Sequence, residues 1–215
     1  MKRIQLWKNR DELSDLYALV DDEDYERVVE AIRHKNGEPG KWYGHFTTFG
    51  YCYAVNGDRR NAMHRVVMNA PKGMDVDHIN HDTLDNRKEN LRICNRSQNS
   101  SNRKLRCDAK SGFKGVYEVR ERRSKYTSKK TGETKVHVRR PKKPWNAYVG
   151  DPTTKYPRNK HINLGYYETA EEAARARDRK ALEVHGEFAY LNFPEEREER
   201  LKELNNGQYR KKNGA

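Results

Sequence analysis

The sequence predicts an α+β protein in which a small ββα module is followed by a three-stranded antiparallel sheet packed on one helix. Two short strand-like segments precede a helix with the capping box Asn95–Gln98 within residues 76–99. Three segments rich in aromatic and β-branched residues follow within residues 114–167. Residues 170–185 then form an alanine-rich helical stretch, whose small side chains suit close packing on a sheet.

The composition limits the core and the location of the protein. The chain has 215 residues, of which 33% are hydrophobic and 36% charged, so we expect one domain or two small ones with a modest core. No apolar run is long enough to span a membrane, and the N-terminus lacks the apolar stretch of a signal peptide. We therefore expect a soluble, cytoplasmic protein that contacts no membrane.

The three cysteines, Cys52, Cys94 and Cys107, stand far apart in the sequence. They form no pair with the spacing of zinc ligands, and an odd number of cysteines cannot all be paired in disulfides. Reduced thiols in an intracellular protein are the simplest interpretation.

The excess positive charge lies in the middle of the chain. Residues 101–160 hold 19 basic and 5 acidic residues, whereas the rest of the chain holds 26 basic and 27 acidic residues. Such a field suits a polyanion, because each neutralised phosphate releases condensed counterions. A solvated linker is the alternative. The stretch also contains aromatic residues, which favour a folded nucleic-acid surface: Phe113, Tyr117, Tyr126, Trp145, Tyr148 and Tyr156.

Residues 1–40 are predicted to be partly helical and partly extended, and the pattern assigns them no role. Either Asp11 or Asp21 would cap a short helix, and apolar residues recur at helical spacing between Tyr25 and Ile32.

A β-hairpin is predicted next. Residues 42–55 are rich in aromatic and β-branched residues, and Asn56-Gly57 is a strong signal for a tight turn. Residues 63–68 would be the returning strand. The following PKGMDVDHIN is typical of a turn that leads into a short strand.

Polar side chains gather where that short strand ends. Asp77 and His78 are adjacent there, and after a turn-rich loop Asn90 precedes a second strand over residues 91–94. A helix follows, and Asn99 lies in its first turn or so. Two strands followed by a helix bring a strand end and a helix residue together over one small cleft.

These residue types suit phosphodiester hydrolysis. A hard divalent cation prefers oxygen ligands, which the Asp77 carboxylate and the Asn99 side-chain carbonyl would supply. His78, with an ordinary pKa near neutrality, is the natural base to take a proton from the attacking water. Asn90 would hold the loop and orient the imidazole. Each residue alone has an ordinary structural interpretation, but their combination in this order favours a nuclease site.

Residues 64–102 resemble the HNH nuclease motif of phage and intron-encoded homing endonucleases, in the variant whose last position is Asn. The matching features are His64-Arg65, VDHIN, DNR, NLR and the terminal QNSSN. The resemblance implies a ββα-metal nuclease module with His78 as general base, Asp77 and Asn99 as ligands of one Mg²⁺ or Mn²⁺, and Asn90 in support. His64 would either face the cleft or finish a strand, and His64 and Arg65 are candidates for active-site support.

The second half is expected to contain three strands, over residues 114–122, 145–150 and 161–167, with loops or hairpin extensions between them. Thr169 and Glu172 predict a capping box, and Gly186 predicts the end of the helix. The stripe facing the sheet would be Ala170, Ala173, Ala174, Ala181 and Val184. The charged C-terminus is expected to be a frayed helix and tail.

Residues 111–194 resemble the Apetala/ethylene-response-factor type of DNA-binding domain, through SGFKGVY, LGYYETAEEAARARD and GEFAYLNFP. The resemblance implies that the sheet, rather than a helix, enters the major groove and reads base edges. Trp145 would pack against the helix. The positions expected to contact DNA are Lys114, Tyr117, Arg120, Arg122, Arg123, Tyr148, His161 and Asn163, with Arg139, Arg140, Lys142 and Lys143 extending the grip on phosphates.

The leading hypothesis is a site-specific homing endonuclease acting on double-stranded DNA. Its parts would be a nuclease domain over residues 41–106, a linker over 107–110, the DNA-binding domain over 111–194 and a charged tail over 195–215. One active site per chain favours a nick by a monomer, and a double-strand cut would need a homodimer or successive nicks. The alternatives are a DNA-binding transcriptional regulator with an inactive nuclease domain and, from basicity alone, an RNA-binding protein.

Overall fold

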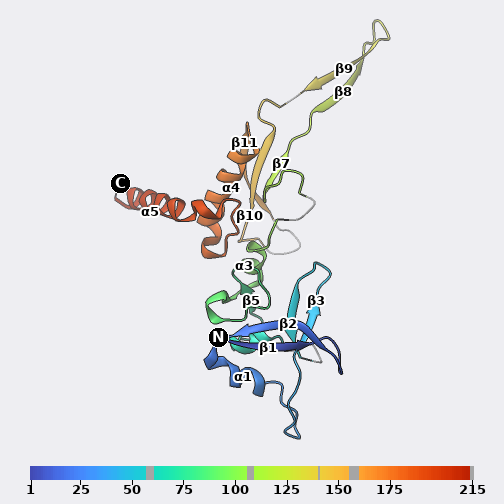
Figure 1. The fold of residues 1–215 in the computed structure, drawn as a ribbon. Helices are drawn as coiled ribbons and strands as arrows, with labels where there is room; N and C mark the ends of the chain where they lie inside the picture. The colour runs from blue at the N-terminus through green and yellow to red at the C-terminus, as the bar shows by residue number, and fades with distance from the viewer. Residues whose placement is uncertain (57–60, 106–108, 140, 155–159, 214–215) are drawn as a thin grey trace. The chain divides into compact units, whose positions relative to one another are not determined.

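The computed structural model describes residues 1–56, 61–105, 109–139, 141–154 and 160–213, and for residues 122, 135, 137, 139 and 206–213 it describes the backbone alone. The chain divides into two compact units, Met1–Ser100 and Ser101–Ala215 (Figure 1). Both units contain sheets and helices, so the fold is of the predicted mixed α+β class. Within the described ranges, no helix is long and apolar enough to cross a membrane.

A four-stranded sheet with the order β2-β1-β3-β4 organises the first unit. β1 (Lys2–Trp7) pairs with β2 (Leu13–Val20) in antiparallel fashion and with β3 (Tyr43–Phe46) in parallel fashion. β3 pairs antiparallel with β4 (Cys52–Val55). The first 40 residues therefore supply two of the four strands of this sheet.

The expectation of helices capped by Asp11 or Asp21 is wrong for most of the N-terminal segment. Alternate residues along β2 are the more buried ones, and this period of two is that of a strand. Helical structure is confined to η1 (Asp22–Asp24) and α1 (Tyr25–Glu30), in which Val28 is fully buried. Asp21 precedes η1, but its side chain makes no capping hydrogen bond there.

The predicted hairpin has its turn at a different place. The backbone reverses between β3 and β4, where Thr47 N–H donates to the Tyr51 carbonyl and Gly50 has a φ of +82°. At the predicted Asn56-Gly57 turn, Asn56 N–H donates to the Asn61 carbonyl, while Gly57 itself lies outside the described residues.

The predicted returning strand is a helix, α2 (Met63–Val67). Met63 and Val67, four positions apart, are both buried in the core, so the burial has a helical period rather than the alternation of a strand. The core of this unit also includes Leu6, Val28, Trp42, Val76 and Leu91.

Two antiparallel strands and a helix complete the first unit. β5 (Asp75–His78) pairs with β6 (Leu91–Cys94), which follows η2 (Lys88–Asn90), and α3 (Arg96–Ser101) comes next. The predicted capping box is confirmed, because Gln98 N–H donates to Asn95 Oδ1 and Asn95 N–H donates to Gln98 Oε1. The predicted order of strand, strand and helix is therefore observed. Cys52 and Cys94 are free thiols, and Cys107 lies outside the described residues.

The second unit is built on a three-stranded antiparallel sheet with the order β11-β10-β7. The bounds predicted for β10 (Trp145–Gly150) and β11 (His161–Tyr167) are confirmed, whereas β7 (Val116–Glu118) is shorter than predicted. β7 is short because its residues pair with β10 only from Val116 to Glu118.

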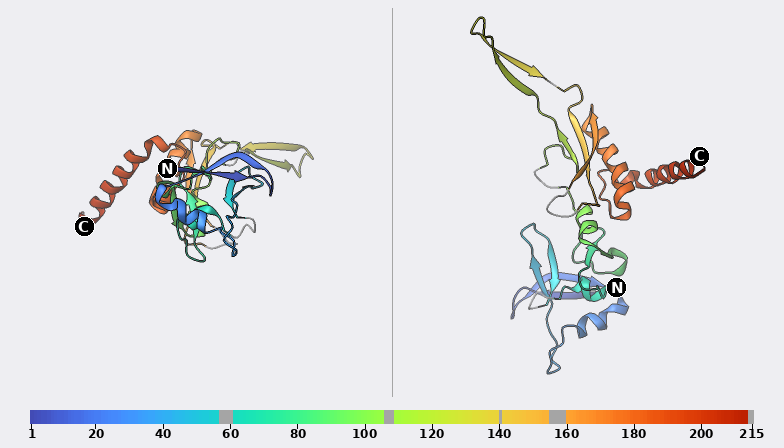
Figure 2. Two further views of the ribbon diagram at one scale, coloured as in Figure 1. Left: turned by 60° about the horizontal axis from the view of Figure 1, so that its bottom comes forward. Right: turned by 180° about the vertical axis from the view of Figure 1, so that it is seen from behind.

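The helix predicted behind the sheet is α4 (Ala170–His185), and its capping box of Thr169 and Glu172 and its stop at Gly186 are confirmed. Figure 2 shows α4 lying along the sheet. The residues that join helix and sheet are Ala170, Ala173 and Ala174 with Val116 and Ala147, and Ala181 and Leu182 with Val149. Trp145 packs against this core, as predicted.

The remaining elements of the second unit lie outside the layers formed by the sheet and α4. β8 (Arg122–Thr127) and β9 (Thr134–Arg139) form a two-stranded hairpin between β7 and β10. Short turns η3 (Gly186–Phe188) and η4 (Pro194–Glu196) follow α4, and the charged C-terminal segment is a helix, α5 (Arg197–Asn213).

Candidate active site

An open cleft of about 400 Å³ lies in the first unit, between the β3–β4 hairpin, α2, β5 and α3. Three of the predicted site residues, His64, Arg65 and Asn99, line it. The other lining residues are His45, Thr47, Tyr53, Val55, Ala62, Asp75 and Val76.

Asn99 is turned toward β5 by the short helix α3. Its Nδ2 donates a hydrogen bond to Asp75 Oδ2 at 3.1 Å. The amide nitrogen therefore has a partner, and the side-chain carbonyl oxygen is the atom of Asn99 that suits a cation.

Asp77 lies two residues further along β5, so its side chain is on the same face of the strand as that of Asp75. Its carboxylate is 6% exposed and is held by Arg92, the residue opposite it on β6: Nη2 and Nε of Arg92 lie 2.6 and 2.9 Å from Oδ2. The two acids of this face thus have different partners, Asn99 for Asp75 and Arg92 for Asp77.

His78 is buried at the end of β5, with 5% of its surface exposed. Its Nε2 lies 3.4 Å from Asn86 Oδ1, and the Asn86 amide is oriented by its own Nδ2, which donates to the Leu84 carbonyl. A carbonyl oxygen only accepts, so this contact favours the neutral tautomer of His78 that carries its proton on Nε2.

Burial lowers the pKa of His78 below 6.5, against the opposing effects of Asn86 and of nearby carboxylates. The imidazole is therefore neutral at pH 7, which is the form that a base requires.

Two more rings surround His78. The His64 ring lies 5.2 Å from the His78 ring, and the Tyr53 ring lies 5.8 and 6.0 Å from those of His64 and His78. Desolvation lowers the pKa of His64 to about 3, and it raises the pKa of Tyr53. Of the two positions considered for His64, the structure places it in α2 with its side chain lining the cleft.

Asn90 is buried and connects both ends of the loop that follows β5. Its Oδ1 accepts from Asn80 N–H at 3.0 Å, and its Nδ2 donates to the carbonyls of Asp85 at 2.9 Å and Asp82 at 3.4 Å. Asn90 thus holds the loop, whereas the residue beside the imidazole nitrogen is Asn86.

The N-terminal sheet fixes the same loop from outside. Leu19 in β2 donates its N–H to the Leu84 carbonyl at 2.8 Å and accepts from Asn86 N–H at 2.9 Å. Asp21 Oδ2 accepts from Lys88 N–H at 2.8 Å. Residues 1–40, to which the sequence assigned no role, therefore hold the position of Asn86 and, through it, of His78.

The side chain of Arg65 is hydrogen-bonded to backbone carbonyls. Its guanidinium donates to the carbonyls of Met74 at 2.6 Å, Pro71 at 3.1 Å and Ala70 at 3.3 Å. It therefore supports the turn that leads into β5, at the edge of the cleft.

The DNA contacts predicted in the second unit fall into two groups. Tyr117, Tyr148, His161 and Asn163 lie on the sheet face opposite α4, because Ala147 and Val149 on either side of Tyr148 point into the core. The rings of Tyr117 and Tyr148 are 5.9 Å apart, and those of Tyr148 and His161 are 4.8 Å apart. These side chains form a continuous aromatic row across the three strands.

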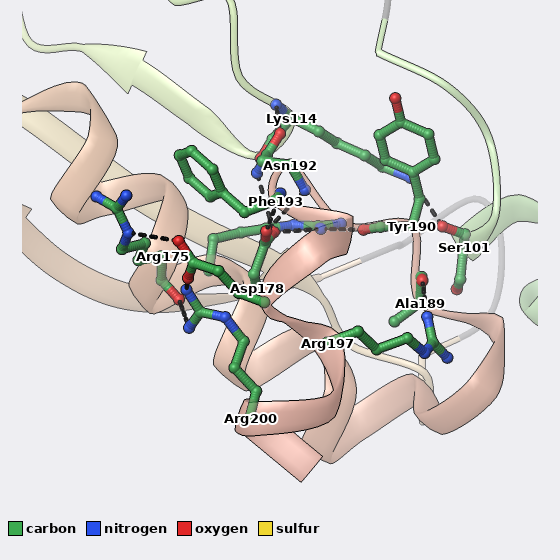
Figure 3. A network of polar contacts seen from close by, with 12 residues as sticks. Ser101, Lys114, Arg175, Asp178, Ala189, Tyr190, Asn192, Phe193, Arg197 and Arg200 are labelled. Carbon is green, nitrogen blue, oxygen red and sulfur yellow. Dashed lines mark hydrogen bonds and ion pairs between the residues drawn. The ribbon is translucent and has the colours of Figure 1, made fainter. Parts of the chain in front are cut away.

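Lys114 is placed differently. Its Nζ donates to the carbonyls of Ser101 at 2.8 Å and Arg103 at 2.7 Å, and lies 5.1 Å from the centre of the Tyr190 ring (Figure 3). Burial, with the charges of Arg177 and Arg103, lowers the pKa of Lys114 to about 7. Its ammonium is thus used inside the unit.

The remaining predicted contacts lie on or near the β8–β9 hairpin. Arg120, Lys142 and Lys143 are exposed, and Arg123 is exposed and pairs with Glu121. The side chains of Arg122 and Arg139, and residue Arg140 altogether, lie outside the described part of the chain.

Sequence reasoning missed three residues of the cleft and its surroundings: Asp75, His45 and Asn86. Asp75 and Asp77 both alternate onto one face of the predicted strand, so the period of two could have indicated Asp75. Asn86 belongs to the DNR that matches the family motif. His45 comes from a separate hairpin, and only the tertiary fold brings it to this cleft.

Comparison with known proteins gives one match and one negative result. No solved structure matches the chain. Residues 62–101, which run from the start of α2 to the end of α3, match the family of HNH endonucleases. The match contains His64, Asp77, His78, Asn90 and Asn99 together. The chain therefore contains an HNH nuclease domain.

Proposed function

We propose that the protein is a site-specific DNA endonuclease of the homing type, which hydrolyses phosphodiester bonds of double-stranded DNA with one Mg²⁺ or Mn²⁺. The observation that carries this proposal is that the HNH match coincides with a cleft lined by His64, Asp75 and Asn99, while the buried Asp77 and His78 lie on the same strand as Asp75. Histidines with a lowered pKa beside a cleft are typical of functional sites.

The donor set fits a hard divalent cation. Asp77 and Asn99 are the proposed ligands, and Asp75 positions Asn99 through its hydrogen bond. Among the described residues no group of three His, Cys, Asp or Glu side chains forms a metal site. Mg²⁺ commonly takes one or two protein carboxylates and keeps water and phosphate oxygens as its other ligands, so two protein ligands suffice. When bound, such a cation stabilises the negative charge on the phosphate and on the leaving oxygen.

His78 is proposed as the general base. Nδ1 would take the proton of the attacking water, while Nε2–H stays on Asn86 Oδ1 and fixes the ring. Asn90 would act as a positioning residue, because its bonds hold the loop that carries Asn86. His64 would exclude water from the base by packing its ring against that of His78.

We propose that the second unit reads the DNA site as an Apetala/ethylene-response-factor type sheet. Its candidate contacts are the row of Tyr117, Tyr148 and His161 together with Asn163. Arg120 and Arg123 would bind phosphates. Lys114 is assigned to the support of the unit rather than to DNA, because two backbone carbonyls already bind its ammonium.

Nicking of a supercoiled plasmid that contains the target locus tests this proposal. The native chain should nick it in Mg²⁺ and not in EDTA, and His78→Ala should lower the rate at least about 100-fold, the usual contribution of a general base. Both proteins should shift the DNA equally in gels. A native chain that binds DNA but never nicks it would favour the alternative of a DNA-binding regulator with an inactive nuclease domain.

A further inference from the structure

The β8–β9 hairpin is a two-stranded ribbon with no core of its own. Its six residue pairs run in continuous register from Arg122–Arg139 to Thr127–Thr134. At its end Ser128 N–H donates to the Glu133 carbonyl at 2.9 Å, and Gly132 has a φ of +69°. In the views of Figures 1 and 2 the ribbon extends beyond β7, β10 and β11 of the same unit.

Apolar side chains of the ribbon face solvent. Val136 is 55% exposed, Val138 is 43% exposed, and Tyr126 on the other face is 67% exposed. The ribbon thus leaves its apolar surface uncovered on both faces, although an isolated hairpin is only marginally stable in water. This is the pattern of a segment that is covered by a partner.

The charge of the ribbon identifies the chemistry of that partner. Residues 122–139 contain seven basic residues and one acidic residue. On the face that carries the valines, Lys125 lies directly opposite Val136 and Arg123 lies opposite Val138. One face therefore presents cations and β-branched methyl groups side by side. A protein partner with a hydrophobic patch would not need this charge, and a membrane would need a much larger apolar surface.

We propose that the ribbon lies in the major groove of the DNA duplex, with the face of Lys125, Val136 and Val138 toward the bases and Arg123 on a phosphate. The major groove admits a two-stranded ribbon, and methyl groups can contact thymine while lysine and arginine reach guanine or phosphates. A strand of six residues is about 20 Å long, so the ribbon would cover about six base pairs. This inference rests on the proposed function and adds a second reading element to it, separate from the three-stranded sheet.

Two substitutions that leave the strand geometry intact test the inference. Lys125→Gln/Lys130→Gln removes two exposed charges, and Lys35→Gln/Lys202→Gln removes two exposed charges elsewhere. In the His78→Ala background, binding to a mixed-sequence duplex is measured over a range of salt concentrations. The plot of log Kd against log salt should become shallower by about 1.8 for the ribbon variant, and stay unchanged for the control.

Val136→Thr/Val138→Thr tests the contact with bases, because threonine keeps the branched shape and the strand preference. Selection from a duplex library with a random core should give a motif that lacks a block of about six base pairs present with the native ribbon, at an unchanged salt slope. A salt slope that is the same for the ribbon and control variants would overturn the proposal, and so would an unchanged motif for the valine variant. If the native chain neither binds nor nicks duplex DNA, the proposed function fails instead.

Discussion

At the scale of single residues, Asp75 and Asp77 share a strand face, where Asp75 accepts a hydrogen bond from Asn99 and Asp77 accepts from Arg92. Asp77 forms an ion pair with Arg92 in which both side chains are largely buried, so Asp77→Ala would leave an uncompensated cation and cost about 3–5 kcal/mol of stability. Asp77→Asn keeps a hydrogen-bond acceptor for Arg92 and is the better probe of metal binding.

We expect Asp77→Asn to abolish nicking, whereas Asp75→Asn should weaken nicking by lowering the affinity for Mg²⁺. Asp75 acts through Asn99, so its loss should raise the Mg²⁺ concentration for half-maximal nicking by about 10- to 100-fold, with nicking restored at high Mg²⁺. Nicking rates across a Mg²⁺ titration measure this. Equal Mg²⁺ curves for Asp75→Asn and the native chain would show that the Asp75–Asn99 bond has no part in metal binding.

The depressed pKa of His64 predicts a pH-dependent stability. The folded state binds the His64 proton less readily than the unfolded state, whose pKa is near 6.5. The stability is therefore fully present above pH 6.5 and is lost as the pH falls toward 3, by at most about 1.4 kcal/mol per pH unit, and less because the ring is only half-buried. The groups that face His64 are Tyr53, His78 and Arg65, of which His78 and Arg65 oppose its protonation.

Urea unfolding of the native chain and His64→Gln between pH 6.5 and 5 measures this effect, since most carboxylates stay ionised in that range. The loss of stability should be smaller in the variant, with the remainder due to His78 and His185, whose pKa values burial also lowers. Parallel profiles for the two proteins would contradict the assignment.

At the scale of elements, the sequence predicted the second unit better than the first. The bounds of β10, β11 and α4 follow from signals within each segment: alternation, a capping box and a terminal glycine. The bounds of α2 and β1 do not, because short apolar runs fit either period until a core selects one. The placement of Asp77 and Asn99 on a strand and a helix likewise follows from local signals, whereas the place of His45 at the cleft depends on the tertiary fold.

Lys114 shows that a match to a motif does not determine what a residue contacts. The family resemblance placed it on DNA, but its ammonium binds the backbone carbonyls of Ser101 and Arg103 within the second unit. The nearby backbone is equally constrained: Gly115 has a φ of +73°, and a Cβ there would lie 2.5 Å from the Tyr148 carbonyl oxygen. This region is therefore a support for the unit.

We expect Lys114→Ala to lower the free energy of unfolding by about 1–3 kcal/mol, because two hydrogen bonds from a charged group are lost. Arg120→Ala is the matched control, since Arg120 is exposed and should affect DNA affinity without changing stability. Thermal unfolding and gel shifts of both variants distinguish the two roles. An unchanged melting temperature for Lys114→Ala, together with weakened DNA binding, would show that Lys114 contacts DNA as the resemblance implies.

At the scale of the whole molecule, chemistry and recognition are proposed to reside in different units. The core of the first unit is formed by residues of that unit alone, and the cleft lies within it. We expect a fragment of residues 1–105 to fold, as judged by circular dichroism, and to nick plasmid DNA with little loss of rate at saturating DNA.

The fragment should lose the preference for one site, because the sheet and the ribbon are absent. Mapping of the nicks by primer extension on the same plasmid measures the preference for fragment and full chain. A fragment that cuts at the same single position as the full chain would show that the nuclease unit selects the site by itself.

The contacts of Leu19 and Asp21 with the loop after β5 make the order around His78 depend on the N-terminal segment. Asp21 and Lys88 are 67 positions apart, so the segment carrying Asn86 is fixed only after both ends of the first unit have left the ribosome and met. A product clipped within its first 20 residues would carry the complete HNH motif but lack the strand that fixes the segment of Asn86. Removal of the N-terminal strand is therefore expected to loosen the loop beside His78 while leaving the matched segment itself intact.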